Sequence, residues 1–275
     1  MARPFIKWAG GKSRLLPLIK NMMPAFGGRY IEPFVGGGAV LLGTNPGNAV
    51  INDMNRNLIN CYGRIRDDWA GTADGFDRMA SEFNLLGNDT EKAEYYRRMR
   101  DEYNNGAAGA RAAALFMFLN KTCFNGLYRE NRSGSFNVPF GHRNTVPPCD
   151  RENLAAVAEI LGRTSISRMD FEEFCDNVDI TEDDFVFFDS PYVETFTAYN
   201  GGGFSENDHV RLRNLFRRLS EKGVRCMATN SASPDVMKLY SEWNILEHEV
   251  MHPINRNGNA RTASEVIITN YTMHN

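Results

Sequence analysis

A glycine-rich turn between an expected strand and an expected helix constrains the fold of this chain more than any other segment. Gly36, Gly37 and Gly38 follow the apolar stretch 29–34 and open a helical pattern over 36–42. Glycines let the backbone turn sharply and approach a ligand closely, and a helix N-terminus favours negative charge. The turn is therefore either the ligand-binding crossover at the start of a doubly wound α/β sheet or a purely structural turn.

The positions of the glycines argue against two common nucleotide motifs. A dinucleotide fingerprint would need glycines at 36, 38 and 41, but position 41 is Leu. Gly11-Lys12-Ser13 matches the end of a phosphate-binding loop, but position 6, where that motif needs glycine, is Ile. Asp53 stands 17 residues after Gly36 at the end of the next expected strand, where an acid usually accepts hydrogen bonds from ribose hydroxyls. The glycine spacing thus argues against a nicotinamide or flavin dinucleotide and against ATP, while Asp53 suits another ligand that carries ribose hydroxyls.

Alternating helix and strand patterns at both ends of the chain enclose a different middle part. The alternation runs to about residue 54 and resumes at Thr164. Between them, helix-like segments over 91–104 and 107–121 precede residues 123–129 and 133–139, which indicate a β-hairpin around a polar turn. The later expected elements are strands over 185–188 and 224–229, a helix over 205–222, and two antiparallel closing strands over 243–250 and 265–271. We therefore predict a split α/β core, 1–54 and 164–275, that holds a mainly helical insertion, 55–163.

Composition narrows the class of protein without identifying a partner. No run reaches the roughly 18–20 apolar residues of a membrane span, and the N-terminus has no apolar signal core, so we expect a cytoplasmic protein. The five cysteines are dispersed and the five histidines lack metal-ligand spacing, so neither a disulfide framework nor a metal cofactor is expected. A net charge of −3 neither supports nor excludes a nucleic-acid partner.

A short acidic motif follows one of the expected core strands. Asp189-Ser190-Pro191-Tyr192 comes directly after the apolar strand 185–188, at the edge where open α/β sheets place their ligands. The Asp189 carboxylate and the Ser190 carbonyl could accept hydrogen bonds from a planar amino group and localise the lone pair on its nitrogen. Pro191 restricts Ser190 to extended geometry, and Tyr192 could stack on a base. The four residues are thus either a catalytic corner for amino-nitrogen chemistry or an ordinary turn.

Six segments of the chain resemble, in the same order, motifs of the DNA adenine-N6 methyltransferase (Dam) family. They are residues 7–12 (KWAGGK), 32–38 (EPFVGGG), 52–55 (NDMN), 125–129 (NGLYR), 134–141 (GSFNVPFG) and 189–192 (DSPY). The resemblance implies a Rossmann-like S-adenosylmethionine-dependent methyltransferase core in which 55–163 is a target-recognition insertion carrying the β-hairpin. It implies S-adenosylmethionine as methyl donor and double-stranded DNA as substrate, in the cytoplasm of a bacterial, archaeal or phage-infected cell. It further implies methyl transfer to N6 of a flipped adenine within GATC.

The resemblance also assigns roles to individual residues. It implies cofactor contacts by Trp8, Lys12, Phe34, Gly36, Gly38, Asp53, Asp170, Phe171 and Asp189. It implies catalysis by Asp189, Ser190, Pro191 and Tyr192, and DNA contacts by Lys7, Asn125, Leu127, Arg129 and Asn137. Within the cofactor set, Phe34 would lie beside the methionine moiety, Asp53 on the ribose, and Asp170 with Phe171 at the adenine. Arg129 suits bidentate contact with O6 and N7 of guanine.

One position departs from the family pattern. The motif most often has Asp-Pro-Pro-Tyr, whereas this chain has Ser190 in place of the first proline. The role expected of position 190 uses its carbonyl, which Ser keeps, so we predict modestly slower turnover and not inactivity. Two other hypotheses stay open, namely a catalytically silent DNA-binding module and a methyltransferase of RNA or of protein amide nitrogen.

Several polar segments permit both a functional and a structural interpretation. Arg97, Arg98 and Arg100, like the four arginines between positions 211 and 218, form either solvated helix faces or phosphate contacts. The stretch 254–261 either closes over the DNA backbone or simply connects two strands. Residues 195–204 are expected to form a flap near the active site.

Overall fold

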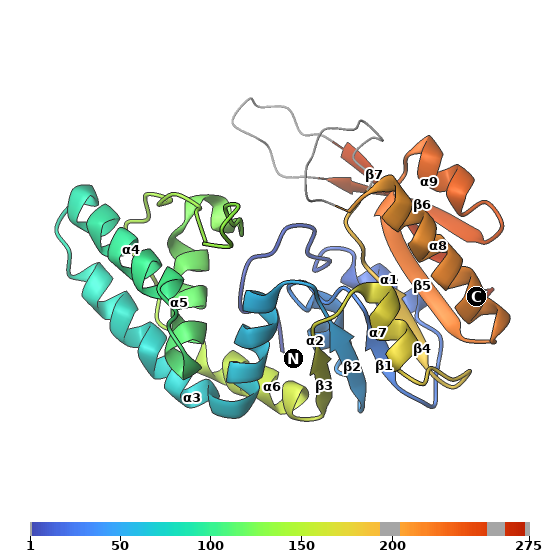
Figure 1. The fold of residues 1–275 in the computed structure, drawn as a ribbon, viewed down its shortest axis with the longest axis horizontal. Helices are drawn as coiled ribbons and strands as arrows, with labels where there is room; N and C mark the ends of the chain where they lie inside the picture. The colour runs from blue at the N-terminus through green and yellow to red at the C-terminus, as the bar shows by residue number, and fades with distance from the viewer. Residues whose placement is uncertain (1, 193–203, 252–261, 273–275) are drawn as a thin grey trace. The chain divides into compact units, whose positions relative to one another are not determined.

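The computed structural model describes residues 2–192, 204–251 and 262–272, which form a mixed α/β fold (Figure 1). The helices are α1 (Leu16–Met22), α2 (Ala39–Thr44), α3 (Arg56–Asn84), α4 (Asp89–Asn104), α5 (Gly109–Thr122), the 3₁₀ turn η1 (Phe124–Gly126), α6 (Arg151–Gly162), α7 (Phe171–Asn177), α8 (Glu206–Glu221) and α9 (Pro234–Leu239). The strands are β1 (Tyr30–Glu32), β2 (Ala49–Asn52), β3 (Thr164–Ser167), β4 (Phe185–Phe188), β5 (Arg225–Ser231), β6 (Asn244–Met251) and β7 (Thr262–Thr269). The predicted α/β class is confirmed.

Among the described residues, the strands form one seven-stranded sheet in the order β3-β2-β1-β4-β5-β7-β6. Strand β1 pairs in parallel with β2 and β4, and β4 pairs in parallel with β5. The last two strands pair antiparallel, β7 with β5 and β6 with β7. Because parallel neighbours end at the same edge, the residues that follow β1, β2 and β4 emerge together at their carboxyl ends.

The central strand β4 is apolar at every position, which suits a place in the middle of the sheet. All four of its residues, Phe185 to Phe188, are fully buried, as expected of a parallel strand covered on both faces. Helix α8 lies beside β5 and buries Leu212, Leu215, Phe216 and Leu219, which recur at helical spacing (Figure 1). Its start is fixed by a capping box in which Ser205 and Asp208 exchange hydrogen bonds with each other's backbone N–H groups.

The chain divides into two compact units, each assembled from several segments. One unit comprises Met1–Lys20, Val35–Gly47 and Asp53–Arg168, and the other comprises Asn21–Phe34, Asn48–Asn52 and Met169–Asn275. The first unit holds helices α2 to α6 together with β3. The second holds the other six strands and helices α7 to α9. The insertion boundaries at 55 and 163 stay a prediction.

Helices α3 and α5 form the centre of the first unit. Gly75 of α3 lets the two backbones come close, because a Cβ atom at this position would lie 3.0 Å from the Cβ of Ala114. Phe83 and Phe118 pack edge to face with ring centroids 5.7 Å apart, and both side chains are fully buried. The aromatic stretch in α5 is therefore core.

Several elements differ from the sequence-based expectations. Helix α3 runs on to Asn84 across non-helical angles at Asp68, so it is much longer than the helix that the apolar spacing over residues 56–66 of the sequence predicts. Helices α6, α7 and α9 were not predicted, because α7 and α9 span fewer than two helical turns and α6 directly precedes a strand. The expected hairpin is joined through the antiparallel bridges Glu130↔Phe136 and Cys123↔Phe140, with η1 at its start.

Some expectations concern segments that the structure does not describe. Residues 195–203 of the expected flap and the polar stretch 254–261 both lie outside the described residues. None of the helices within the described ranges has the length and apolarity needed to cross a bilayer.

Candidate functional site

The glycine turn of the first unit has a backbone that only glycine adopts easily. Gly36 and Gly38 have positive φ angles of 47° and 68°. The Trp8 side chain covers the turn, since a Cβ atom on Gly36 or Gly37 would lie 3.0 Å from it. A Cβ atom on Gly38 would lie 2.7 Å from the hydroxyl of Tyr62, which donates a hydrogen bond to the carbonyl of Gly36 at 2.8 Å. Two aromatic side chains therefore fix the shape of the turn.

Asp53 joins the end of β2 to the same glycine turn. Its Oδ2 accepts a hydrogen bond from the Gly36 N–H at 3.0 Å, and its Oδ1 accepts one from the Asn55 N–H at 2.8 Å. Burial raises the pKa of the Asp53 carboxyl group above its usual range, and these two hydrogen bonds partly oppose that effect. Each carboxylate oxygen can accept a further hydrogen bond. The turn and its acid thus fit a ligand that brings ribose hydroxyls.

Lys12 lies near the start of the same unit and is only 5% exposed. Its Nζ donates a hydrogen bond to the carbonyl of Gly10 at 2.5 Å, within the KWAGGK segment. The cofactor contact expected of Lys12 stays a prediction.

A second group of predicted cofactor residues lies in the other unit. Phe34 and Phe171 pack with ring centroids 5.3 Å apart, and Phe204 joins both rings at 5.7 Å and 5.6 Å. Asp170 caps α7 by accepting hydrogen bonds from the N–H groups of Glu172 and Glu173. The structure thus brings Phe34, Asp170 and Phe171 together, and it adds Phe204, the last residue of the stretch 195–204 that was expected near the active site.

Arg211 holds this second group in place. Its guanidinium forms ion pairs with Asp170 at 2.6 Å and with Glu172 at 2.9 Å. It also lies over the Phe171 ring, 4.8 Å from the centroid. The carboxylates around the guanidinium raise the pKa of Arg211 above its usual value, so it stays charged. The sequence placed Arg211 in a basic cluster, because the spacing of residues along α8 cannot show what lies opposite.

The Asp-Ser-Pro-Tyr corner follows the central strand β4. The hydroxyl of Thr229, on β5, donates a hydrogen bond to Oδ1 of Asp189 at 2.7 Å. Ser190 is 3% exposed and Pro191 is exposed. The corner follows β4 at the same edge of the sheet at which Phe34 follows β1, because β1 and β4 are parallel neighbours. The chain thus places a partly buried carboxylate at the carboxyl edge of the sheet.

Tyr192 is held at the end of this corner. Its hydroxyl donates a hydrogen bond to Oε2 of Glu265 on β7 at 2.9 Å. Burial raises the pKa of the Tyr192 phenol far above its usual value, and the negative charges of Asp189 and Glu265 add to this effect. The phenol therefore stays neutral. Neither Thr229 nor Glu265 was singled out in the sequence, since no local motif contains them.

The expected DNA-reading residues lie on the hairpin of the first unit. Arg129 is exposed, and its Nε donates a hydrogen bond to Oδ1 of Asn137 at 2.8 Å across the hairpin. Asn125, with a positive φ of 55°, lies between two exposed apolar side chains, Phe124 at 48% and Leu127 at 45%. The hairpin therefore presents polar and apolar groups together to solvent.

Lys7 is tied to the base of the hairpin. Its N–H donates to Oδ1 of Asn120 at 2.7 Å, and the Asn120 amide donates to the carbonyls of Lys7 and Gly126 at 2.9 Å and 3.1 Å. A Cβ atom on Gly126 would lie 2.5 Å from the Lys7 side chain. The structure thus brings Lys7 together with the predicted hairpin residues.

The arginines of the basic cluster on α8 form ion pairs with nearby carboxylates. Arg213 pairs with Glu242 at 3.1 Å, and Arg217 contacts the same carboxylate. Arg218 pairs with Asp176 at 2.9 Å. Within the described residues, this helix face is therefore neutralised by its own surroundings, and the structural interpretation of the cluster is favoured.

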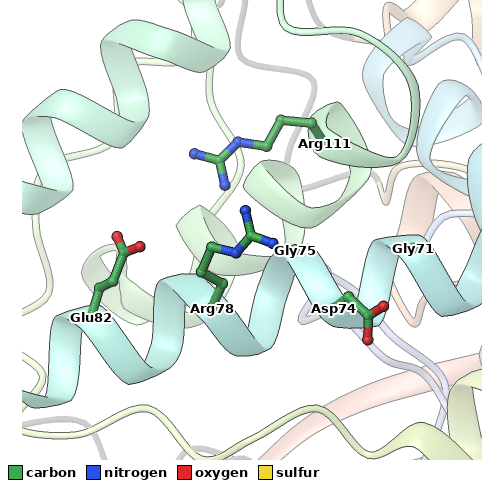
Figure 2. Close-up of a pocket in the computed structure, with 6 residues that line it drawn as sticks. All are labelled: Gly71, Asp74, Gly75, Arg78, Glu82 and Arg111. Carbon is green, nitrogen blue, oxygen red and sulfur yellow. The ribbon is translucent and has the colours of Figure 1, made fainter.

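A cavity of about 430 Å³ on α3 and α5 is separate from all of these residues (Figure 2). It is lined by Gly71, Asp74, Gly75, Arg78, Glu82 and Arg111. Arg111 pairs with Glu102 at 2.7 Å, and Asp74 pairs with Arg151 at 2.6 Å. The two remaining charges, Arg78 and Glu82, have opposite signs. The lining is therefore charge-balanced and shares no residue with the predicted site.

The fold and these groups together define a class of enzyme. An α/β sheet, a glycine turn beside an acid suited to ribose, and a carboxylate corner after a central strand are the parts of an S-adenosylmethionine-dependent methyltransferase. The chain belongs to the D12 class N6 adenine-specific DNA methyltransferase family, whose family model matches residues 8–254. The family predicted from the six motifs, the enzyme class and S-adenosylmethionine as methyl donor are thereby confirmed.

Relatives from bacteria and archaea align over nearly the full chain. The type II methyltransferase M1.LlaDCHI of Lactococcus lactis subsp. cremoris is 38% identical, over 98% of this chain and 95% of that protein. The type II methyltransferase M.MjaIII of Methanocaldococcus jannaschii is 36% identical, over 98% and 99%. The DNA adenine methylase of Escherichia coli K12 is 31% identical, over 98% and 95%.

Proposed function

We propose that this enzyme methylates N6 of an adenine that is turned out of the DNA helix, within the sequence GATC. The observation that carries the proposal is the Asp189 carboxylate, held by Thr229 directly after the central strand at the carboxyl edge of the sheet. Chemistry on an amino group inside a duplex needs the base outside the stack, because the target atom is otherwise out of reach. The hairpin's resemblance to the Dam family supports GATC as the site.

Asp189 and Ser190 would activate the target nitrogen. The exocyclic nitrogen of adenine is a poor nucleophile because its lone pair is delocalised into the ring. The Asp189 carboxylate and the Ser190 carbonyl would accept hydrogen bonds from the two amino hydrogens, which favours a tetrahedral nitrogen with a localised pair. Thr229 would keep the carboxylate in one orientation. The same carboxylate would be the first acceptor for the proton that leaves the amino group.

Tyr192 would hold the extruded base. Its hydroxyl is anchored on Glu265, so the ring has little freedom to turn away. Stacking of a base on an aromatic ring contributes about 1–3 kcal/mol. The tyrosine would thus lower the cost of extruding the adenine and fix its plane beside Asp189.

The remaining predicted residues would hold the methyl donor. When bound, S-adenosylmethionine supplies a methyl group attached to a sulfonium, which is a good leaving group. Trp8, Gly36 and Gly38 would line the binding site of the cofactor. Lys12 would contact its carboxylate, and Asp53 would accept hydrogen bonds from its ribose hydroxyls. Phe34 would lie beside its methionine moiety, and Asp170 and Phe171 would surround its adenine end.

The direct test uses purified protein, labelled S-adenosylmethionine, and two duplexes that differ only in the presence of GATC. We expect label in the GATC duplex alone and none in either duplex with Asp189→Ala. Equal labelling of both duplexes would reject GATC. Absence of labelling in every DNA would favour the silent DNA-binding module, and stronger labelling of RNA or peptide competitors would favour those substrates.

Sequence discrimination is tested on the hairpin. Arg129→Ala is expected to relax the preference at one base pair by about 1–3 kcal/mol. Asn137→Ala is expected to relax the preference at the same base pair by a smaller amount, because Asn137 contacts the Arg129 guanidinium and would orient it. Arg98→Ala, on α4, is the control that leaves the ranking of sequences unchanged. Unaltered discrimination in Arg129→Ala would contradict the assignment of the reading hairpin.

A further inference from the structure

Tyr128 is the hairpin residue that turns away from its exposed neighbours. Leu127 and Arg129 are exposed on either side of it, whereas the Tyr128 ring stacks on Trp8 with centroids 5.4 Å apart and planes 27° from parallel. Phe116 of α5 contacts the Tyr128 ring at a centroid distance of 5.5 Å. The residue between two expected DNA contacts is therefore part of a partly buried aromatic cluster.

Trp8 extends this cluster to the glycine turn. Its side chain lies so close to Gly36 and Gly37 that a Cβ atom on either would come within 3.0 Å of it. A single indole therefore separates the turn from Tyr128. A displacement of the Tyr128 ring would be passed to the turn, because the Trp8 side chain contacts both and side chains in contact transmit strain.

A hydrogen-bond chain also connects the hairpin to the segment that carries Asp53, by a route that does not pass through Trp8. The Asn57 amide donates to the Tyr128 hydroxyl and to Oε1 of Glu130, both at 2.7 Å, and the hydroxyl in turn donates to Glu130. Asn57 lies in the first turn of α3, just after Asn55, whose N–H donates to Asp53. The hairpin is thus tied both to the glycine turn and to the segment that carries the acid suited to ribose.

From these two connections we infer that Tyr128 is a positioning residue that couples DNA recognition by the hairpin to cofactor binding at the glycine turn. The inference rests on the proposed functions of these two elements. Coupling between sites is reciprocal, so DNA bound at the hairpin would tighten cofactor binding by the same factor by which cofactor tightens DNA binding. A residue with a purely structural role would change both affinities without changing their ratio.

The test measures binding of S-adenosylhomocysteine by calorimetry, without DNA and with a saturating GATC duplex. The ratio of the two dissociation constants is the coupling factor, and no methyl transfer is involved. For the unchanged protein we expect a factor of at least about five, the lower end of ordinary coupling. In Tyr128→Ala we expect the factor to fall toward one. Tyr128→Phe keeps the ring and is expected to retain part of the coupling.

Two further variants make the result decisive. Asn57→Ala removes the hydrogen-bond chain at a half-buried helix position without deleting an aromatic ring, so it reports on the coupling even if Tyr128→Ala does not fold. Tyr96→Phe is the matched control for Tyr128→Phe, because it also removes one hydroxyl hydrogen bond in the same unit, to the carbonyl of Val138. We expect a lower factor in Asn57→Ala and an unchanged one in Tyr96→Phe.

Failure of this inference is distinguishable from failure of the proposed GATC site. The binding experiment is repeated with long mixed-sequence duplex DNA, which contains every tetranucleotide, while methylation of GATC is assayed separately. A coupling factor of one in the active, unchanged protein would overturn the inference. So would an unchanged factor in folded Tyr128→Ala and Asn57→Ala, or a loss of affinity that is equal with and without DNA.

Discussion

The Thr229 hydroxyl donates a hydrogen bond to Oδ1 of Asp189 at 2.7 Å. The register of two parallel strands explains why these residues meet. Phe188 of β4 lies opposite Ala228 of β5, so the next residue along each strand, Asp189 and Thr229, are neighbours at the carboxyl edge. Thr229 is 1% exposed, which keeps water from competing for this hydrogen bond.

Thr229→Val should slow the methyl-transfer step. A hydrogen bond to a charged group contributes about 1.5–3 kcal/mol, so its loss should lower the single-turnover rate about tenfold to a hundredfold. The dissociation constants for DNA and S-adenosylhomocysteine should change little, because the hydroxyl is expected to orient Asp189 and to touch neither ligand. Thr229→Ser keeps the hydroxyl and is the control, expected near the original rate. A normal rate in Thr229→Val would show that Asp189 needs no such support.

This pair also marks what the sequence could and could not predict. The strand 185–188, the glycine turn and the four-residue corner were predicted because each is a contiguous pattern with its own chemistry. Thr229 was not, since its role depends on the register between two strands that are separated by a helix. Contacts that depend on strand register or on a partner far along the chain produce no pattern in the local sequence.

Arg211 shows the same limit on a helix. Its neighbours in sequence, Arg213, Arg217 and Arg218, made it one of four arginines in a charged run. The structure separates it from them, because Arg211 is the member of this run that pairs with Asp170 and lies over the Phe171 ring, whereas Arg213 and Arg217 pair with Glu242 and Arg218 with Asp176. Periodicity shows that residues share a face of α8, but it does not show which acidic residue faces them.

Arg211→Ala should weaken cofactor binding. Without the guanidinium, Asp170 loses its charged partner and Phe171 loses the group that covers its ring, so both would be held less firmly. Loss of about 1 kcal/mol of orientation corresponds to about a fivefold higher dissociation constant for S-adenosylhomocysteine. Arg217→Ala is the control, because an exposed ion pair contributes about 0–1 kcal/mol and Arg217 pairs with Glu242, away from Asp170 and Phe171. Equal effects of the two variants would argue against a role of Arg211 at the cofactor.

Ser190→Pro should restore the commoner family motif and speed the enzyme modestly. A proline ring would fix φ at position 190 and hold the carbonyl of this residue more firmly, so the single-turnover rate is expected to rise about two- to fivefold, the equivalent of about 0.4–1 kcal/mol in the barrier. Ser190→Ala should leave the rate unchanged, because the carbonyl is retained. A large loss of rate in Ser190→Ala would mean that the buried Ser190 hydroxyl acts directly. If the unchanged protein were inactive and the Ser190→Pro variant active, the hypothesis of a catalytically silent DNA-binding module would be supported.

Cofactor affinity should depend on pH through Asp53. The ionised carboxylate is the better acceptor for ribose hydroxyls, so binding is strongest above the pKa of Asp53 and weakens as the pH falls through it. Because burial raises that pKa, the weakening should begin at a higher pH than an exposed aspartate would give. Calorimetry with S-adenosylhomocysteine at a series of pH values measures this directly.

The Asp53→Asn variant should bind S-adenosylhomocysteine about tenfold more weakly at neutral pH, the equivalent of about 1.4 kcal/mol, and should lose the decline in affinity at acidic pH. Asp183→Asn, an exposed position, should keep it. An identical decline in Asp53→Asn would assign the titration to another group.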